Sequence, residues 1–598
     1  MLARRHLLAI AAALVALSIT APAAAAQQPP PWLKVQDGVT QPQFDLATAI
    51  EETVYVETKL DTDADGRSDR IRIRISRPAE TSTQGIKVPV IFEHSPYRGD
   101  RGNAVNHPVD VDDMPQERGS QFRRALAASA GARGDLPDSS LDNHYVPRGY
   151  AVVLGESIGT FNSDGCPDIG GRWETLGTKA VIDWLNGRVR GYDVDGNRVQ
   201  ADWTTGDVGM TGVSYNGTLS NQVATTGVEG LRTIVPVSAI SSWYDYYRAN
   251  GLVVAPHSET QGVRENEYLG EDTDVLADFI AARMRTTCAA QRRKLVARQD
   301  RATGDYSSFW AKRDYLPRAR KIKASVFIVH GLNDWNVKTK AFAAWWERLS
   351  VPRKLWLHNG GHGGPRNAPS YKVTENRWFD HWLFGVPNEI MAEPPVTLQR
   401  EDGVYTSENE WPARGARATR LWLSPSGALS GRGPRGSRQR EHSFVDRGRE
   451  LDTDDVLIQN PDADHPNRLA YVTRPLTSDV RLSGTPWVSL RMAVENRTAA
   501  NLTAVLVDYS SGAPIMVTRG WLDPQNRSGP AHGRRVERGR TYRLRWDLQP
   551  DDHLFEAGHR IGLVVVSTDH DYTMRPDPGT RLSLKPRGSR LILPLVQG

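Results

Sequence analysis

Short apolar runs alternate with polar loops and helix-like segments between residues 88 and 364. Segments that fit helices, 178–186 and 341–350, fall between some of these runs. A strand buried in a parallel sheet reads as a continuous apolar run, and each parallel crossover needs a connection long enough for a helix. The pattern therefore predicts an α/β fold with helices covering a parallel sheet. The apolar runs are 88–92, 150–154, 208–210, 233–237 and 325–329.

The chain of 598 residues is long enough for several domains, at roughly 150 residues each. Residues 258–320 interrupt the alternation with charged, Arg- and Ala-rich sequence, which predicts an inserted helical cap. Strand-like runs separated by Gly-, Pro- and Asn-rich turns follow, and they predict an all-β sandwich of the jelly-roll type. We therefore expect an α/β domain in two parts, 27–257 and 321–390, around this cap, and the sandwich at 391–598.

The first 26 residues have the features of an export signal, so we expect a secreted protein. Arg4 and Arg5 form a charged start, an apolar run spans 7–20, and small residues follow at 21–26. The apolar run is shorter than the roughly 20 residues that span a bilayer, although an uncleaved membrane anchor is the alternative. The paired arginines fit twin-arginine export as well as the general secretory route, and both stay open.

The chain has two cysteines, Cys166 and Cys288. Cysteines in an oxidising compartment often pair, but the sequence does not give the distance between their Cα atoms, so pairing is left open.

The formal charge of +5 is small for this length, and one local Arg excess lies in a Gly/Ser/Pro-rich stretch at 414–449. A nucleic-acid interface needs a concentrated basic face, so we expect a solvated loop there.

The segment Asp61–Asp69 resembles a calcium loop. Acidic residues fall at its positions 1, 3, 5 and 9, and a glycine falls at position 6. Position 12 is Arg72, where such a loop needs a bidentate glutamate. An Asp- and Gly-rich turn between two strands explains the segment without metal, so we favour a turn and leave calcium as the alternative.

The segment Gly209–Gly217 follows an apolar run and leads into helix-compatible sequence. A serine on a tight strand-to-helix turn is the nucleophile elbow of α/β hydrolases, which makes Ser214 the candidate nucleophile. The usual G-x-S-x-G pattern would place glycine at 216, where Asn216 stands, and the glycine comes at 217. Asparagine tolerates a positive φ better than most residues, so we expect the turn to form.

Asp334 and His362 complete a triad with Ser214 in the chain order of this architecture. Each follows a strand-like run, 325–329 and 354–357, and the carboxyl ends of parallel strands meet at one edge of a sheet. In this interpretation His362 takes the serine proton, and Asp334 fixes the histidine tautomer.

His358 is the rival for the base and Asp380 for the acid of this triad, and the reaction also needs an oxyanion hole. His358 sits at the end of its strand and is expected to be packed, and Asp380 falls in a predicted helix. An oxyanion hole needs donors aimed at the developing alkoxide. We expect the amide of Tyr215 and the hydroxyl of Tyr97, which follows the early strand, because no glycine run stands there.

The chain resembles the Xaa-Pro dipeptidyl-peptidase family, which is related to cocaine-esterase-like acyl esterases and α-amino-acid ester hydrolases. Four motifs carry the resemblance, and it extends over nearly all of the mature chain. It implies an α/β-hydrolase fold with a helical cap and a C-terminal jelly roll, and an oxyanion hole that uses a tyrosine hydroxyl, here Tyr97. The motifs are Gly212–Gly217, Ser95–Tyr97, Val181–Leu185 and Arg377–Gly385.

Two further segments, Ile240–Arg248 and His330–Lys338, are similar to the peptidase branch of these relatives. The resemblance implies that Trp243 and Tyr246 line the pocket for a proline ring. It also implies that Glu271 binds the free α-amino group of the substrate. The long N-terminal helical extension of larger members is absent, so the oligomeric state stays open.

Together the motifs and the resemblance predict a secreted serine exopeptidase that releases Xaa-Pro dipeptides from unblocked peptides through an acyl-enzyme. The expected partner is a peptide with a penultimate proline; we expect no nucleic acid, no membrane, no cofactor and no metal. An acyl esterase or α-amino-acid ester hydrolase on the same triad is the alternative. A carbohydrate- or surface-binding protein that uses the sandwich is a second alternative.

Overall fold

A computed structural model describes most of the chain. It covers residues 28–99, 102, 104–112, 128–129, 140–254, 270–434, 440–448 and 454–596. The expected export signal lies outside these residues. Within the described ranges, no helix combines the length and the apolar character that crossing a membrane requires.

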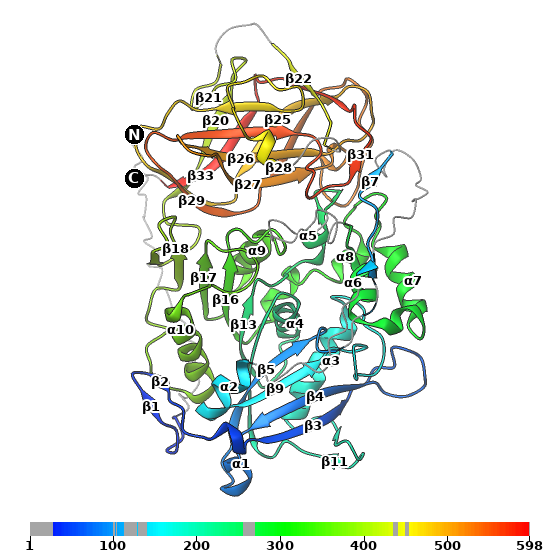
Figure 1. Cartoon of the computed structure of the whole chain (residues 1–598), viewed down its shortest axis with the longest axis vertical. Coiled ribbons are helices and arrows are strands. Elements are labelled where there is room, and N and C mark those ends of the chain that lie inside the picture. The colour runs from blue at the N-terminus through cyan, green and yellow to red at the C-terminus, as the bar shows by residue number, and fades with distance from the viewer. Residues whose placement is uncertain are drawn as a thin grey trace, which may run out of the picture.

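In the part of the chain that the structure describes, a twelve-stranded sheet forms the centre of the larger domain (Figure 1). In spatial order its strands are β11 (Arg198–Val199), β10 (Gly191–Tyr192), β3 (Ile50–Glu57), β4 (Arg70–Arg77), β9 (Ala151–Glu156), β5 (Val88–Ser95), β12 (Thr204–Val213), β13 (Leu231–Val237), β16 (Ser325–Gly331), β17 (Arg353–His358), β18 (Val396–Gln399) and β19 (Tyr405–Glu408). The strands from β9 to β18 pair in parallel, and antiparallel strands complete both sides. The predicted parallel sheet is confirmed.

Helices cover both faces of this sheet. Successive side chains of a strand point to opposite faces, so Phe92 of β5 joins one apolar core and Ile91 joins the other. This two-sided burial explains why the central strands are apolar throughout. The helices of the first face are α3 (Arg172–Leu185), α4 (Tyr215–Ala224) and α9 (Lys340–Arg348); those of the second are α2 (Ser140–Tyr145), α10 (Pro369–Phe379) and the π-helical turn η5 (Asp380–Phe384).

The predicted cap is helical in its described part. Cys288, at its centre, forms a disulfide with Cys166, which lies in the loop between β9 and α3; the S–S distance is 2.01 Å. The question that the sequence left open is therefore answered, because the two cysteines pair and tie the cap to the α/β domain. The helices of the cap are α6 (Thr273–Ile280), η3 (Ala282–Arg285), α7 (Ala289–Arg298), α8 (Ser308–Ala311) and η4 (Leu316–Lys321).

The C-terminal part is a sandwich of two antiparallel sheets, with nine and four strands among the described residues (Figure 1). Apolar side chains from both sheets fill the space between them, among them Leu490, Leu591 and Leu563. The sandwich is confirmed, and its jelly-roll topology stays a prediction. The larger sheet holds β20 (Ala416–Leu423), β21 (Leu429–Ser430), β22 (His442–Val445), β24 (Val480–Gly484), β25 (Trp487–Val494), β28 (Tyr542–Asp547), β29 (Asp551–Phe555), β32 (Arg581–Leu584) and β33 (Arg590–Val596); the smaller holds β23 (Leu469–Val472), β26 (Leu502–Tyr509), β27 (Ile515–Leu522) and β30 (Arg560–Val566).

The α/β sheet continues beyond the boundary expected at residue 390. β18 pairs in parallel with β17, and β19 pairs with β18, so the sheet ends at Glu408. The reason is burial, because Val396 and Leu398 fill the same apolar core as Leu355 and Leu357. The remaining short elements are β1 (Val35–Gln36), β2 (Val39–Thr40), η1 (Leu46–Thr48), α1 (Glu80–Thr83), β6 (Ala104–Val105), β7 (Asp110–Val111), β8 (Ala128–Ser129), η2 (Val146–Arg148), α5 (Trp243–Tyr247), β14 (Arg248–Ala249), β15 (Leu252–Val253), α11 (Asp454–Leu457), η6 (Pro524–Asn526) and β31 (Arg575–Pro576).

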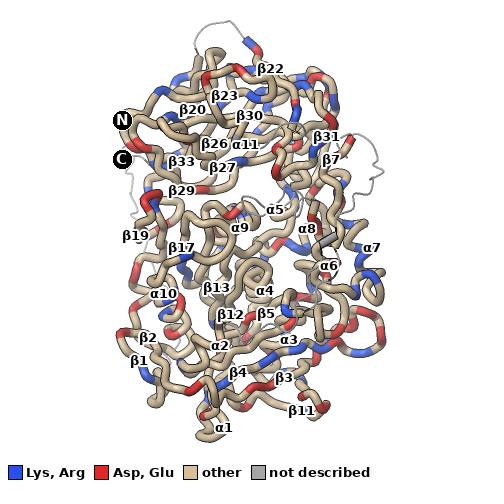
Figure 2. Tube along the Cα trace, viewed as in Figure 1, with Lys and Arg blue, Asp and Glu red and all other residues tan. Residues whose placement is uncertain are grey.

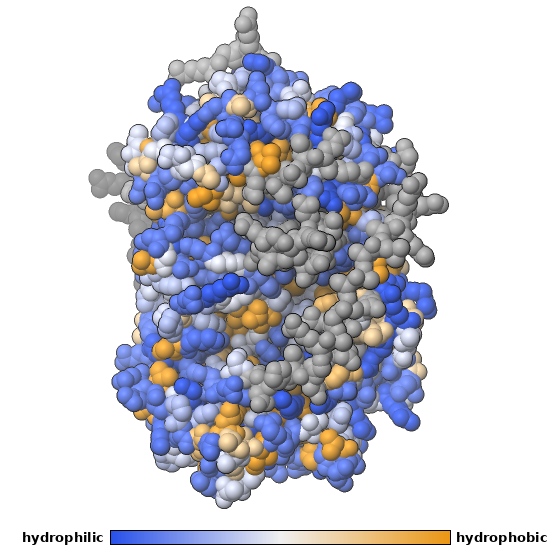
Figure 3. Space-filling view, in the orientation of Figure 1, coloured by the Kyte–Doolittle hydropathy of each residue, from blue (hydrophilic) through white to orange (hydrophobic). Residues whose placement is uncertain are grey.

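Charges are mixed along both parts of the molecule. Figure 2 shows Lys and Arg interspersed with Asp and Glu over the α/β domain, the cap and the sandwich. On the face drawn in Figure 3, the apolar side chains of the described residues form small separate groups among polar ones. This mixture corresponds to the small net charge of the sequence.

Removal of the disulfide should destabilise the protein. The Cys166→Ser/Cys288→Ser variant frees two segments that are 122 residues apart, and loss of such a link typically costs about 2–4 kcal/mol in the free energy of unfolding. Urea titration followed by circular dichroism measures this loss. Reduced wild-type protein should match the variant, and a variant as stable as the oxidised wild type would contradict the expectation.

Candidate active site

Ser214 lies between the end of β12 and the start of α4. Its backbone has φ 61° and ψ −123°, a conformation that residues other than glycine rarely adopt and that costs on the order of 1–3 kcal/mol. Two backbone hydrogen bonds hold it there: the Ser214 amide donates to Val237 at 2.9 Å, and the Thr218 amide donates to Ser214 at 2.8 Å. The strained strand-to-helix turn that the motif predicted is present.

Two glycines let α4 cross β12 closely. A Cβ on Gly217 would lie 2.5 Å from the Gly212 carbonyl oxygen, and a Cβ on Gly212 would lie 2.6 Å from that of Asn216. The expectation that Asn216 supplies a positive φ is wrong, because Asn216 lies in the first turn of α4 and Ser214 itself takes that conformation. The close approach falls at residue 217, so glycine is required there and not at 216.

Asp334 and His362 meet at the carboxyl edge of the sheet. His362 Nδ1 lies 2.9 Å from Asp334 Oδ2, and the carboxylate is fully buried while the ring is about one quarter exposed. The other oxygen, Oδ1, accepts the amides of Asn336 at 3.1 Å and Val337 at 2.7 Å. A histidine that donates Nδ1–H to a carboxylate presents Nε2 as its basic nitrogen.

A chain of hydrogen bonds joins the loops that carry these residues. Val237, which accepts from Ser214, is followed by Ser238, whose amide donates to Val329 of β16 at 2.8 Å. The Ser238 hydroxyl accepts from the Gly363 amide at 3.0 Å, next to His362. The nucleophile turn and the histidine loop are therefore fixed to the same strand end, as the sheet order requires.

The rival residues have structural partners. His358 is buried, its Nε2 lies 3.1 Å from the Gly363 carbonyl oxygen, and burial lowers its pKa. Asp380 accepts from the Thr40 amide and hydroxyl, both at 2.9 Å, and from the Tyr150 hydroxyl at 2.6 Å. Asp380 thus anchors the N-terminal strand β2 to η5.

The two oxyanion candidates lie side by side. Tyr97 follows β5, and its half-buried ring makes an edge contact with the Tyr215 ring at a centroid distance of 6.0 Å and with Phe279 of α6 at 6.3 Å. Tyr215 is the first residue of α4, where backbone amides have no partner within the helix. The Tyr97 ring thus packs against both the first residue of α4 and helix α6 of the cap.

Aromatic rings of α5 continue this cluster. Trp243 is fully buried, donates Nε1–H to the Tyr315 hydroxyl at 2.8 Å, and contacts the rings of Tyr215 and Tyr246 at 4.9 and 5.7 Å. Tyr246 is half-buried, and its hydroxyl donates to Asn336 Oδ1 at 2.9 Å. Asn336 lies on the loop that carries Asp334. The structure therefore brings the two predicted pocket residues together beside the elbow.

Glu271 lies next to these rings. Its Oε1 accepts from the Tyr247 hydroxyl at 2.7 Å, and among the described residues no cationic group contacts its carboxylate. Burial, with repulsion from Asp272, raises the pKa of Glu271 to about 7, although the bond from Tyr247 opposes this. Asp272 itself is fully paired, with Arg248 at 2.8 Å and Arg301 at 3.0 Å. Glu271 is thus the carboxylate of this region that can accept an added cation.

Sequence reasoning missed a buried carboxylate behind the elbow. Glu174 of α3 accepts from the Tyr215 hydroxyl at 2.8 Å and from the Gly170 amide at 2.7 Å. Burial, together with Asp168, raises the pKa of Glu174 to about 8. The available signal was helical periodicity, since Glu174 shares a face with the apolar Val181 and Leu185.

The Asp61–Asp69 loop forms a hydrogen-bonded turn. Carboxylate oxygens of Asp61, Asp63 and Asp65 lie within 4.8 Å of one another. Backbone amides of the same loop already donate to them, for example Gly66 to Asp61 at 3.1 Å and Arg67 to Asp65 at 2.8 Å. These bonds are those of Asp-rich turns without metal, and calcium binding stays the alternative.

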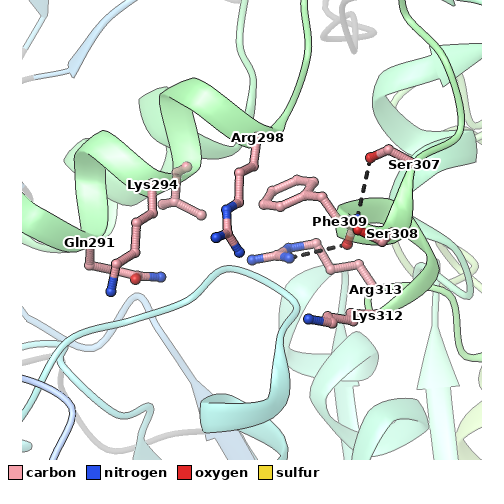
Figure 4. A pocket seen from close by; sticks show the side chains of 9 residues that line it. Gln291, Lys294, Arg298, Ser307, Ser308, Phe309, Lys312 and Arg313 are labelled. Carbon is pink, nitrogen blue, oxygen red and sulfur yellow. Dashed lines mark hydrogen bonds between the residues drawn. The ribbon is translucent and has the colours of Figure 1, made fainter.

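A separate cavity lies in the cap, between α7 and α8 (Figure 4). Its volume is about 350 Å³, and the Arg313 guanidinium on its wall donates to the Phe309 carbonyl at 3.2 Å. None of its lining residues belongs to the loops that carry Ser214, Asp334 and His362. The lining residues are Gln291, Lys294, Leu295, Arg298, Ser307, Ser308, Phe309, Lys312 and Arg313.

Glu174→Gln should change the pH dependence of stability. The pKa of Glu174 is raised from 4.5 to about 8 on folding, so its contribution to stability is complete below pH 4.5 and is lost as the pH rises through about 8. Glutamine stays neutral and can still donate to Tyr215 and accept from Gly170. The stability of the variant relative to wild type should therefore rise between pH 5 and pH 8, measured by urea titration. A difference that does not change with pH would contradict this assignment.

Sequence comparison matches the α/β part and the sandwich of this chain separately to two domains of one family. Residues 65–364 match the family described as X-Pro dipeptidyl-peptidase (S15 family), and residues 388–593 match the X-Pro dipeptidyl-peptidase C-terminal non-catalytic domain. A Bacillus anthracis protein named "Putative Xaa-Pro dipeptidyl-peptidase" is 47% identical over 571 residues, 94% of this chain and 91% of that protein. The Xaa-Pro dipeptidyl-peptidase of Lactiplantibacillus plantarum is 34% identical over 657 residues, 94% of this chain and 78% of that protein.

Solved structures support the fold. An α-amino acid ester hydrolase is similar with a TM-score of 0.63 and 18% identity, over 92% of this chain and 96% of that chain. A CocE/NonD family hydrolase from Staphylococcus aureus has a TM-score of 0.65 and 16% identity, over 95% of this chain and 99% of that chain. At such identities the similarity shows the fold alone, an α/β hydrolase followed by a β domain, which confirms the predicted fold class.

Proposed function

The chain belongs to the X-Pro dipeptidyl-peptidase (S15) family and is a serine hydrolase of the peptidase class, and from this premise we propose that it releases Xaa-Pro dipeptides from peptides with a free N-terminus. The observation that carries the proposal is Glu271, a carboxylate without a cationic partner among the described residues, beside the aromatic cluster of the elbow. A carboxylate in this position can pair with the α-ammonium group of a substrate. Cleavage then falls a short, fixed distance from the N-terminus.

The proposed mechanism proceeds through an acyl-enzyme. His362 removes the proton of Ser214 Oγ as it attacks the carbonyl after proline, while Asp334 holds the imidazole and stabilises its charged form. The Tyr215 amide and the Tyr97 hydroxyl donate to the oxyanion. His362 then protonates the leaving amine, and a water molecule deprotonated by His362 hydrolyses the ester to free the dipeptide.

Two features support selectivity in this proposal. The half-buried flat ring of Tyr246, with the fully buried Trp243 packed against it, suits the compact apolar ring of proline. An N-blocked peptide would leave the Glu271 carboxylate without its cation in a partly desolvated site, and such a loss is costly. The α-amino-acid ester hydrolase alternative would use the same triad and the same carboxylate, so only the substrate separates it from the peptidase.

We also propose that the protein is exported. The Cys166–Cys288 disulfide supports this proposal, since disulfides persist in oxidising compartments and are rare in the cytosol. The signal-like first 26 residues point the same way. N-terminal sequencing of the protein recovered from the culture medium tests export, and full-length protein retained in the cytosol would contradict it.

Ser214→Ala should lower kcat for Gly-Pro-p-nitroanilide by on the order of 10⁴ or more, because the attacking oxygen is removed. Release of p-nitroaniline at saturating substrate measures the effect. Circular dichroism and the melting temperature check that the variant is folded. Turnover at the wild-type rate would show that the nucleophile lies elsewhere.

Glu271→Gln should raise KM for Gly-Pro-p-nitroanilide by about tenfold or more, since a buried charge pair with the substrate is lost. In the wild type, Glu271 is protonated below its pKa of about 7, so KM should rise as the pH falls through 7. The variant should lose this dependence of KM on pH.

Glu375→Gln is the matched control for Glu271→Gln. Glu375 accepts from the Tyr371 hydroxyl at 2.9 Å within α10, so it repeats the glutamate–tyrosine contact away from the pocket. Its KM should follow that of the wild type at every pH. An unchanged KM in Glu271→Gln, or an equal rise in both variants, would remove Glu271 from substrate binding.

A further inference from the structure

The β-sandwich reaches the loop that carries the acid of the proposed triad. Trp335 directly follows Asp334, and its half-buried ring lies against two residues of the sandwich. The guanidinium carbon of Arg519, on β27, is 4.8 Å from the Trp335 ring centroid and 4.4 Å from the Tyr572 ring centroid. The Trp335 and Tyr572 rings are 6.0 Å apart. A cation over aromatic faces at these distances is attracted by their electron density.

Arg519 is itself fixed from behind. Its Nη1 lies 3.0 Å and 3.2 Å from the two carboxylate oxygens of Asp569, and Trp521 Nε1 donates to the same carboxylate at 2.8 Å. Arg519 is 3% exposed and Asp569 is fully buried. A buried ion pair with further hydrogen bonds holds its cation in one place, since any displacement leaves charges unpaired in a medium of low polarity.

The α/β domain contacts the other sides of the loop that carries Asp334, which we call the acid loop. The Asn333 amide donates to the Gly360 carbonyl at 3.2 Å on the histidine loop, and Asn336 accepts from Tyr246 at 2.9 Å. Trp335 also packs on a small apolar cluster to which both domains contribute, Leu252 and Val254 from the α/β part and Trp521 and Tyr572 from the sandwich. The sandwich thus packs on the residue next to Asp334.

We infer that the Arg519–Asp569 pair is a positioning element of the catalytic centre, which fixes Trp335 and so holds Asp334 against His362. This inference rests on the proposed function, in which Asp334 orients His362. It gives the C-terminal domain, described in the family as non-catalytic, a direct effect on the chemical step. Arg519 does not touch substrate, so its effect passes through the acid loop.

A displaced Asp334 should change the pH profile of the reaction, which a general loss of stability would not do. A carboxylate near His362 Nδ1 favours the charged imidazolium, so a displaced Asp334 stabilises this form less and lowers the pKa of the histidine. The low-pH limb of kcat, which does not include the effect of Glu271 on KM, should then move to lower pH, and kcat should fall because the imidazolium of the transition state is less stabilised. KM depends on the amine and proline contacts and should change little.

Arg519→Met removes the charge and the planar group while keeping the length of the side chain. We expect a 10- to 100-fold lower kcat for Gly-Pro-p-nitroanilide, a KM within about threefold of wild type, and a low-pH limb displaced to lower pH. Arg519→Lys keeps the cation over the two rings and should recover most of the lost kcat. Active-site titration with a fluorophosphonate counts the folded sites, so kcat is expressed per functional molecule.

Two further variants complete the test. Arg560→Met removes another arginine–aspartate pair of the sandwich, which is more exposed and joins Arg560 to Asp462 at 2.6 and 2.8 Å, and it should keep the wild-type kcat and pH profile. Trp335→Leu should reproduce the Arg519→Met effects. The double variant Arg519→Met/Trp335→Leu should be no worse than either single variant, because both remove the same contact.

The outcomes separate this inference from the proposed function. An active Ser214→Ala variant would overturn the proposed function and this inference with it. With Ser214→Ala inactive, a wild-type kcat and pH limb in Arg519→Met would overturn the inference alone. A lower kcat without a displaced limb, equal losses in Arg560→Met, or additive losses in the double variant would also overturn it.

Discussion

Parallel hydrogen bonding between β12, β13, β16 and β17 sets the geometry on which the candidate site depends. Because these strands run in one direction, the loops that follow them leave the sheet at one edge. Ser214, Asp334 and His362 each stand in one of these loops. The bond from Ser214 to Val237 and the bond that the Gly363 amide of the histidine loop donates to Ser238 then set the relative position of the loops. Ser214 keeps its positive φ because these hydrogen bonds, together with the close packing at Gly212 and Gly217, hold the turn in this conformation.

Several charged side chains are buried near this edge. Most of it is matched, as in the pair Arg248–Asp272 and the pair Arg519–Asp569, where each cation meets a carboxylate. In a medium of low polarity an unmatched charge is costly, so pairing is the rule. Glu271 and Glu174 depart from this rule, because each accepts from a tyrosine hydroxyl and burial raises its pKa, to about 7 for Glu271 and about 8 for Glu174. A carboxylate that binds a cationic group of the substrate lacks a cationic partner until the substrate binds. The free N-terminus of a peptide is such a cationic group.

The sequence predicted those parts of the site that local pattern determines. It placed Ser214, Asp334 and His362 after apolar strands, and the structure has each of them in a loop that follows β12, β16 or β17. Contacts between distant segments left no local signal. Arg519 meets Trp335 across a domain interface, Cys166 pairs with Cys288 over 122 residues, and the last strands of the sheet lie beyond residue 390. Such contacts depend on how domains dock, and no periodicity in the chain encodes that.

The central claim is that the enzyme recognises a free N-terminus and a proline next to it. The most direct measurement compares release of p-nitroaniline from Gly-Pro-p-nitroanilide and from its N-acetylated form, with p-nitrophenyl butyrate alongside. The account predicts fast cleavage of the free-amine substrate and loss of that cleavage on acetylation. Equal cleavage of both anilides would contradict recognition of the amine, and ester cleavage with both anilides inert would contradict the peptidase assignment.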